Sequence, residues 1–199
     1  MPTKVKILEE SREYDGFFKI DKAVLQYEKF DGEMSEAITR LNFNRGDSVA
    51  VLLYDDRKDS VTLVKQFRYP AYVNGGPGWI LELVAGVIED GRSVDSVARS
   101  ELLEEAGYEV DDLRPIGNFY VSPGGTSERI HLYLGFAHRK VGSGGGVAYE
   151  QEDIQVVEIA LDEAMKMLET GGICDAKTII ALQWLKLHIT MEERYEVSD

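Results

Sequence analysis

One stretch of the sequence, residues 79–107, constrains the fold more than any other. It begins with an apolar run, WILELVAG, which is typical of a buried strand, and the polar segment GVIEDGR continues it. The following residues, SVDSVARSELLEEAG, indicate a helix, because Ser93 suits the N-cap and Gly107 suits the position just past the C-terminus. We therefore expect a buried strand that leads through a short loop into a helix over 93–106.

The C-terminal end of this predicted helix carries three glutamates, Glu101, Glu104 and Glu105. The helix dipole favours cations there, and the spacing puts the carboxylates on one face, where they repel one another. A helix that served stability alone would carry Lys or Arg, so the broken rule indicates a functional site. Carboxylates are preferred ligands of Mg²⁺, which proteins commonly share with substrate phosphates. The alternative is an acidic, solvated helix end.

The overall charge excludes several classes of partner. Asp and Glu number 36 against 22 Lys and Arg, which gives a net charge of −14. A surface of this charge repels nucleic acid and anionic membranes, so we expect neither as a partner. An anionic substrate would need a local cation to receive it.

Cysteine and histidine give no further catalytic pattern. Cys174 is the only cysteine, so an internal disulfide is excluded, and we expect it to be a small buried apolar residue. The three histidines, His131, His138 and His188, are scattered, which argues against a His-based metal site. The N-terminus has no apolar leader and no apolar run approaches ~18 residues, so we expect a cytoplasmic protein without a membrane span.

The chain divides into a short strand-rich start and a longer mixed part. Residues 1–45 alternate roughly between apolar and polar, which predicts a half-exposed antiparallel meander and a dimerisation element. Residues 46–199 predict a mixed α/β domain. A glycine-rich loop at 142–146 lacks Rossmann and P-loop spacing, and we expect it to close over substrate. The expected strands and helices are a hairpin at 48–54 and 60–67, strands at 114–121, 129–137 and 154–160, and helices at 161–171 and 176–189.

The segment AGVIEDGRSVDSVARSELLEEAGY, at 85–108, resembles the Nudix signature G-x5-E-x7-R-E-U-x-E-E-x-G-U, where U is a bulky apolar residue. Two positions depart from it: Arg92 replaces the usual Glu, and Ser100 replaces the usual Arg. In the family these two residues brace the loop against the helix, so their joint loss indicates a paired exchange. The residues in register are Gly86, Glu101, Leu102, Glu104, Glu105, Gly107 and Tyr108.

The resemblance extends over most of the chain and points to one branch, the GDP-mannose pyrophosphatases, which are close to the ADP-ribose pyrophosphatases. It implies an α/β/α sandwich with a mixed sheet, preceded by a small antiparallel β element, and a homodimer whose partner completes the pocket. The matching segments are QFRYPAYVNG at 66–75, LELVAG at 81–86, YVSPGGTSERIH at 120–131, GGGVAYEQEDI at 144–154 and GGICDAKTIIAL at 171–182.

The resemblance also implies roles for individual residues. The carbonyl of Ala85 and the carboxylates of Glu101, Glu105 and Glu152 match ligands of Mg²⁺, for which Mn²⁺ can substitute. Glu104 matches a further ligand or water-orienting group, and Glu152 and Glu128 are both candidates for the general base. The positions that match substrate contacts are Phe17, Arg40, Arg68, Glu128 and Lys177.

The resemblance therefore implies a Mg²⁺-dependent hydrolase that cleaves the diphosphate of a nucleoside diphosphate sugar such as GDP-mannose. The products would be a nucleoside monophosphate and a sugar phosphate. Two alternatives remain: the same chemistry on ADP-ribose, and a weakly catalytic nucleotide-binding module, which the exchange at Arg92 and Ser100 motivates.

Overall fold

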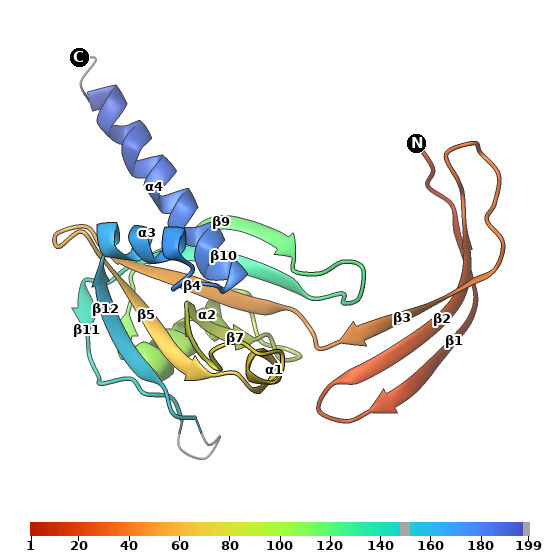
Figure 1. Cartoon of the computed structure of the whole chain (residues 1–199), viewed down its shortest axis with the longest axis horizontal. Helices are drawn as coiled ribbons and strands as arrows, with labels where there is room; N and C mark the ends of the chain where they lie inside the picture. The colour runs from red at the N-terminus through yellow and green to blue at the C-terminus, as the bar shows by residue number, and fades with distance from the viewer. Residues whose placement is uncertain (148–151, 197–199) are drawn as a thin grey trace. The chain divides into compact units, whose positions relative to one another are not determined.

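A computed structural model describes residues 1–147 and 152–196 of the chain. The chain forms two compact units, and the first unit includes a loop segment from the middle of the sequence. Unit 1 comprises Met1–Asp47 and Tyr120–Arg129, and unit 2 comprises Ser48–Phe119 and the described residues from Ile130 onward. Figure 1 labels most of the elements in both units.

Unit 1 is built on a three-stranded antiparallel sheet of order β1-β2-β3, which confirms the predicted meander. The strands are β1 (Val5–Asp15), β2 (Lys19–Tyr27) and β3 (Ile38–Asn44). Every residue of β1 except Ser11 is exposed. Apolar side chains therefore face solvent, among them Val5, Ile7, Leu8, Tyr14 and Leu41.

Unit 2 contains a mixed seven-stranded sheet with the order β12-β5-β4-β10-β9, to which β6 and β7 are added. The strand β10 runs parallel to β4, whereas β5 and β12 are antiparallel to their neighbours. The strands are β4 (Ser48–Asp55), β5 (Ser60–Phe67), β6 (Trp79–Glu82), β7 (Val84–Val87), β9 (Leu113–Tyr120), β10 (Arg129–Phe136) and β12 (Gln155–Ala160). A separate pair joins β8 (Tyr108–Glu109) to β11 (Arg139–Lys140).

Helices cover both faces of this sheet, which confirms the predicted α/β layering. Successive side chains of a strand point to opposite faces, and β4 is buried along its whole length. Its Leu52 packs in the core that includes residues of α3 (Leu161–Thr170) and α4 (Ala176–Glu196). Its Val51 packs in the second core, with residues of α2 (Val94–Glu101) and of the π-helical turn η1 (Leu102–Ala106). A short helix, α1 (Tyr69–Val73), follows β5.

The predicted single strand at 79–86 is two strands, because the β4–β5 hairpin opens. The two strands pair directly only near their turn, from Leu53–Thr62 to Asp55–Ser60. Beyond it, β6 pairs with β5 and β7 pairs with β4. Leu83 lies between β6 and β7, where the chain changes its pairing partner from β5 to β4. Its N–H donates to Thr178 Oγ1 of α4 at 3.0 Å.

Two further expectations differ from the structure. The predicted helix over 93–106 is α-helical only to Glu101 and then widens into η1, the kind of π-turn that is frequent at functional sites. Cys174 is exposed, so the prediction of a buried cysteine is wrong. It lies just before α4, where its neighbour Ile173 fills the apolar core instead. In the described part of the chain, no helix is both long and apolar enough to cross a membrane.

Candidate active site

The three glutamates differ in burial because the helix changes type beneath them. Glu101 ends α2 and is half-buried, whereas Glu104 and Glu105 belong to η1. Glu104 is exposed, but Glu105 is only 3% exposed. The turn ends at Gly107, whose φ of 74° is left-handed and therefore suits glycine.

The strand β7 lies directly against these carboxylates. The N–H of Ala85 donates to Glu105 Oε2 at 3.1 Å. A Cβ added to Gly86 would meet Glu101 Oε1 at 2.2 Å, so only glycine allows Glu101 this close to the backbone. The opened hairpin thus inserts β7 where its backbone touches two of the predicted ligands.

The glycine-rich loop brings the fourth predicted ligand, Glu152, to the same turn. Glu152 Oε2 accepts a hydrogen bond from Val147 N at 3.0 Å. This loop is fixed where it meets the glutamates, through Gly145 N to Glu105 O at 2.9 Å and Gly146 N to Glu104 O at 3.0 Å. Glu105 therefore contacts the Ala85 backbone and lies close enough to Glu101 and Glu152 for their charges to act on it. Residues 148–151, which belong to the matching segment GGGVAYEQEDI at 144–154, lie outside the described residues.

The electrostatics of this group fit a divalent cation. Burial, the largest cause, and the negative charges of Glu101 and Glu152 together raise the pKa of Glu105 to about 8. The Ala85 N–H and the charge of Arg68 act in the opposite direction. A bound cation would offset the charge repulsion and the desolvation cost of a buried carboxylate beside two others. Carboxylate and carbonyl oxygens are the ligand atoms that Mg²⁺ prefers.

Two predicted substrate-binding cations, Arg68 and Lys177, meet at a carboxylate that the sequence analysis did not select. Arg68 Nε and Nη2 lie 2.8 and 2.6 Å from Glu82 Oε2. Lys177 Nζ lies 3.4 Å from Glu82 Oε1 and 2.8 Å from Asp175 Oδ1. The sequence signal for Glu82 was a charged residue within the apolar run WILELVAG, and the structure shows that this residue is buried.

The comparisons with known proteins agree with this geometry. Residues 44–182 match the NUDIX domain family. The matched residues are more than half of the chain. The chain belongs to the Nudix family. It is 42% identical over 185 residues to the ADP-ribose pyrophosphatase of Escherichia coli strain K12, covering 92% of this chain and 88% of that protein. It is 38% identical over 186 residues to the GDP-mannose pyrophosphatase of Pectobacterium atrosepticum, covering 92% of this chain and 94% of that protein.

A solved structure has the same fold. It is described as an ADP compounds hydrolase, and it superposes with a TM-score of 0.73 over 96% of this chain and 97% of its own. Its sequence identity of 21% makes it informative about the Nudix fold alone.

The two departures from the Nudix signature contact each other. Arg92 Nη2 donates to Ser100 Oγ at 2.6 Å and to the carbonyl of Ser96 at 3.2 Å. Ser100 Oγ in turn donates to Ser96 O at 3.1 Å. The end of the loop between β7 and α2 is therefore held onto α2 by a hydrogen-bonded pair, Arg92 and Ser100, in place of the usual Glu and Arg.

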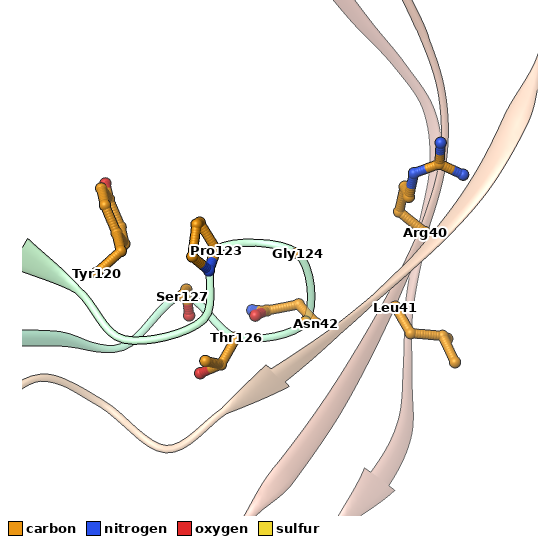
Figure 2. A pocket seen from close by; sticks show the side chains of 9 residues that line it. Arg40, Leu41, Asn42, Tyr120, Pro123, Gly124, Thr126 and Ser127 are labelled. Atoms are coloured by element: carbon orange, nitrogen blue, oxygen red, sulfur yellow. The ribbon is translucent and has the colours of Figure 1, made fainter. Parts of the chain in front are cut away.

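The remaining predicted residues, Phe17, Arg40 and Glu128, belong to unit 1. Phe17 is 91% exposed, and Glu128 is buried, with its Oε1 3.5 Å from Arg45 Nε. Arg40 lines a cavity of about 420 Å³ between β3 and the loop that follows Tyr120. Figure 2 shows Asn42 turned toward this loop and the Arg40 guanidinium turned away from it. The other lining residues are Leu41, Tyr120, Pro123, Gly124, Gly125, Thr126 and Ser127.

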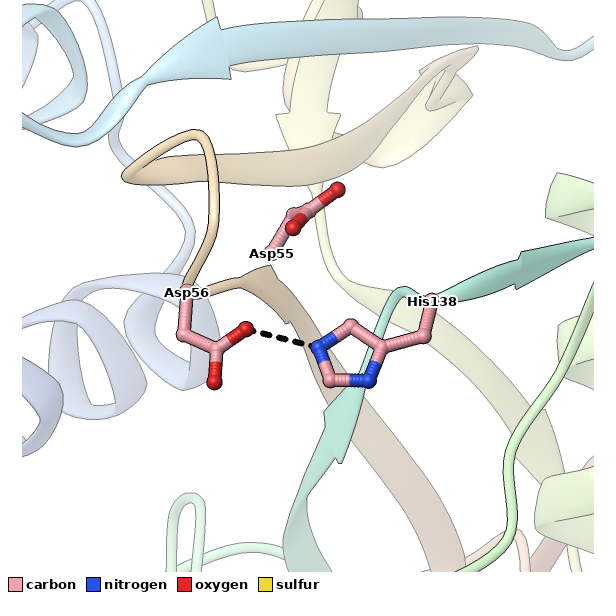
Figure 3. Close-up of side chains that lie close together, drawn as sticks. All are labelled: Asp55, Asp56 and His138. Atoms are coloured by element: carbon pink, nitrogen blue, oxygen red, sulfur yellow. Dashed lines mark hydrogen bonds and ion pairs between the residues drawn. The ribbon is translucent and has the colours of Figure 1, made fainter.

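A second group of possible metal ligands lies at the β4–β5 turn, and sequence reasoning missed it. It comprises Asp55, Asp56 and His138, whose ligand atoms lie within 4.8 Å of one another. Figure 3 shows His138 bonded to Asp56, a contact of 2.7 Å from Nε2 to Oδ1. Asp55 is already paired with Arg57, whose hydrogen bonds lower the pKa of Asp55 to about 2. We therefore place the candidate chemistry at the glutamates.

Proposed function

We propose that this chain is a divalent-metal-dependent pyrophosphohydrolase that cleaves the diphosphate of a nucleoside diphosphate sugar. The observation that carries the proposal is Glu105, buried between Glu101 and Glu152 and bonded to the backbone of Ala85. Such a group binds a cation that can also hold phosphate oxygens. Membership of the Nudix family and similarity to relatives named as pyrophosphatases support it.

The ligands for Mg²⁺, or for Mn²⁺ in its place, would be the Ala85 carbonyl and the carboxylates of Glu101, Glu105 and Glu152. When bound, the ion would neutralise phosphate charge and lower the pKa of the attacking water. Gly86 has no side chain, which lets the Glu101 carboxylate lie against the backbone of β7. The 142–146 loop holds Glu152 against η1. These contacts orient the ligands before substrate arrives.

The reaction adds one water across the P–O–P bridge. The water oxygen joins one phosphorus, the bridging oxygen leaves with the other phosphate, and the water's proton passes to a base. Glu152 and Glu128 are the candidates for that base, and the exposed Glu104 would orient the water. Arg68 and Lys177 would bind the diphosphate, since a guanidinium fork and an ammonium both suit phosphate.

Two sugar nucleotides are candidate substrates. The short motifs around 120–131 and 171–182 resemble the GDP-mannose branch. The second candidate is ADP-ribose, which is favoured by the 42% identity to an ADP-ribose pyrophosphatase against 38% to a GDP-mannose pyrophosphatase. Phe17 and Arg40 would contact the nucleoside in either case. A homodimer and a cytoplasmic location also stay predictions.

Charge-removing variants of the glutamates test the metal site. We expect Glu101→Gln and Glu105→Gln each to lower turnover of a nucleotide sugar by ~10² or more in excess Mg²⁺, because glutamine keeps the shape but not the charge that holds the ion. The measurement is the release of nucleoside monophosphate, with Glu158→Gln as a control at an ion pair on β12. Near-normal rates in both variants would place the site elsewhere.

A further inference from the structure

Glu82 is a buried carboxylate that joins two cations from distant parts of the chain. It ends β6, and only 7% of its side chain is exposed. Each of its oxygens has a different partner: Oε2 accepts from Arg68, just after β5, and Oε1 lies beside Lys177, at the start of α4. A carboxylate this buried persists when charged partners and hydrogen bonds compensate its desolvation.

The arrangement leaves part of Arg68 open. The guanidinium has five N–H donors, and within residues 1–147 and 152–189 its hydrogen-bond and ion-pair contacts are those of Nε and Nη2 with Glu82. The Arg68 side chain is 41% exposed, so donors on the far side of the fork can reach a ligand. Because the charge of Arg68 also lowers the pKa of Glu105, the guanidinium lies close enough to act on the glutamate group as well.

Lys177 is fixed more tightly than Arg68. Its side chain is 15% exposed and contacts both Glu82 and Asp175. Asp175 in turn accepts hydrogen bonds from the backbone and the hydroxyl of Thr178, at 3.0 and 2.6 Å. The hydroxyl of Thr178 also binds Leu83 N, the residue after Glu82. Glu82 is therefore held through its backbone neighbour as well as through its side chain.

We propose that Glu82 is a positioning residue, which holds Arg68 and Lys177 together so that the open side of the Arg68 fork receives the substrate's diphosphate. The inference rests on the proposed pyrophosphohydrolase function and adds a residue that acts through two others. Without the Glu82 charge, the two cations repel each other and Arg68 gains rotamers that face solvent. Diphosphate binding then weakens in the ground state and the transition state alike, which raises KM and leaves kcat nearly unchanged.

The test is Glu82→Gln in the full chain, with KM and kcat measured for ADP-ribose and GDP-mannose in saturating Mg²⁺. We expect KM for the better substrate to rise by ~10-fold, with kcat within ~3-fold of the parent. Glu158→Gln is the matched control, since it removes the same charge from a pair with Lys58 and should change neither constant. If Glu82→Gln fails to fold, Glu82→Asp is the second variant. It shortens the side chain that joins Arg68 and Lys177 by one methylene, and it should show the same rise in KM.

A double variant separates positioning from a purely structural role. If Glu82 acts through Arg68, then Arg68→Lys combined with Glu82→Gln should raise KM no further than Arg68→Lys alone. An unchanged KM accompanied by a lower melting temperature would overturn the proposal and leave Glu82 a structural ion-pair partner. Additive effects of the two substitutions would overturn it as well. An absence of turnover in the parent chain would instead contradict the proposed function.

Discussion

Single residues show how the same chemical group takes different roles on one helix end. Glu104 and Glu105 are neighbours in sequence, yet one is exposed and the other is almost fully buried beside β7. The signature predicted that both would lie near a metal, because its spacing fixes the helix face. It could not predict their burial, which depends on the widening of the helix into η1 and on the insertion of β7.

Glu82 shows the limit of residue-level prediction more clearly. Its partners lie 14 and 95 residues away in the sequence, and no local pattern relates them. Arg68 and Lys177 could be selected through a resemblance, but the carboxylate that joins them becomes visible only when β6 and α4 are placed together. The same holds for Asp55 and His138, which the fold brings together from β4 and the end of β10.

Glu105 predicts how stability without metal depends on pH. Its pKa is raised to about 8 from an ordinary value near 4.5, so the folded protein binds a proton there more tightly than the unfolded chain. Stability from this group is therefore present below pH ~4.5 and is lost as the pH rises toward 8. In EDTA we expect Glu105→Gln to melt at a higher temperature than the parent at pH 8.5.

The difference in melting temperature should shrink toward pH 5, where the parent's Glu105 is protonated in the folded state. Thermal unfolding followed by circular dichroism at both pH values measures it. Mg²⁺ should stabilise the parent at pH 8.5 more than the variant, since the ion replaces the proton as the partner of the carboxylate. A parent that is more stable than the variant at pH 8.5 in EDTA would contradict the assignment.

Elements show where the sequence pattern was sufficient and where it failed. The hairpin, the strands that follow and the two C-terminal helices were predictable, because alternation and amphipathic spacing directly record which face is buried. The division of 79–87 into β6 and β7 was not, since an apolar run does not record a change of pairing partner. That change creates the site by placing Ala85 and Gly86 against the glutamates.

The loop between β7 and α2 gives a prediction at this scale. Arg92 fixes the C-terminal end of this loop to α2 through hydrogen bonds to Ser96 and Ser100. Ser100 directly precedes Glu101. We expect Arg92→Ala to raise the Mg²⁺ concentration for half-maximal rate by ~3–10-fold, because Glu101 then loses its brace while all the ligands remain. Titration of the rate with Mg²⁺ measures this effect.

Arg139→Ala is the control for that titration, since Arg139 pairs with Glu109 on β11 and β8. The double variant Arg92→Glu with Ser100→Arg restores the usual Nudix pair and should recover the parent's Mg²⁺ requirement. A normal requirement in Arg92→Ala would show that the brace does not affect metal binding.

The whole molecule combines a well-buried catalytic unit with a sheet that has little core of its own. The sequence predicted the N-terminal meander but not that Tyr120–Arg129 would belong to the same unit, because that grouping depends on pairing such as the Phe43–Thr126 bridge. A two-layered core is missing from β1–β3, and thin sheets of this kind are marginal alone. Exposed apolar side chains on β1 therefore favour association with a second copy.

We expect a homodimer at micromolar concentration, formed through residues 1–45. Val5 and Ile7 pair with Tyr27 and Leu25, so they lie on one face of the sheet, and 63% and 48% of their surfaces are exposed. Ile7→Lys should shift the protein toward monomer by placing a charge in the interface. Glu9→Lys serves as the control, because Glu9 pairs with Val24 and therefore lies on the other face of the sheet. Light scattering with size exclusion measures the mass. A monomeric parent would contradict both the dimer and any pocket that a second copy completes.

Substrate choice is the property that the whole molecule decides. The short motifs favour GDP-mannose, but they cover a small part of the chain, and one of them crosses residues outside the described ranges. Identity to an ADP-ribose pyrophosphatase is 42% and extends over 92% of the chain. We therefore expect ADP-ribose to be hydrolysed with kcat/KM at least ~10-fold above that of GDP-mannose, a difference of ~1.4 kcal/mol in transition-state binding.

A panel of ADP-ribose, GDP-mannose, other sugar nucleotides and dinucleotides in Mg²⁺ measures this preference, with products separated by chromatography. AMP and ribose 5-phosphate as the dominant products would support ADP-ribose, since the attack on the diphosphate leaves one phosphate on each half. GMP and mannose 1-phosphate as the dominant products would instead support the motif-based expectation and leave the metal chemistry intact. No turnover of any member would favour a nucleotide-binding module, for which the exchange at Arg92 and Ser100 would be the first place to look.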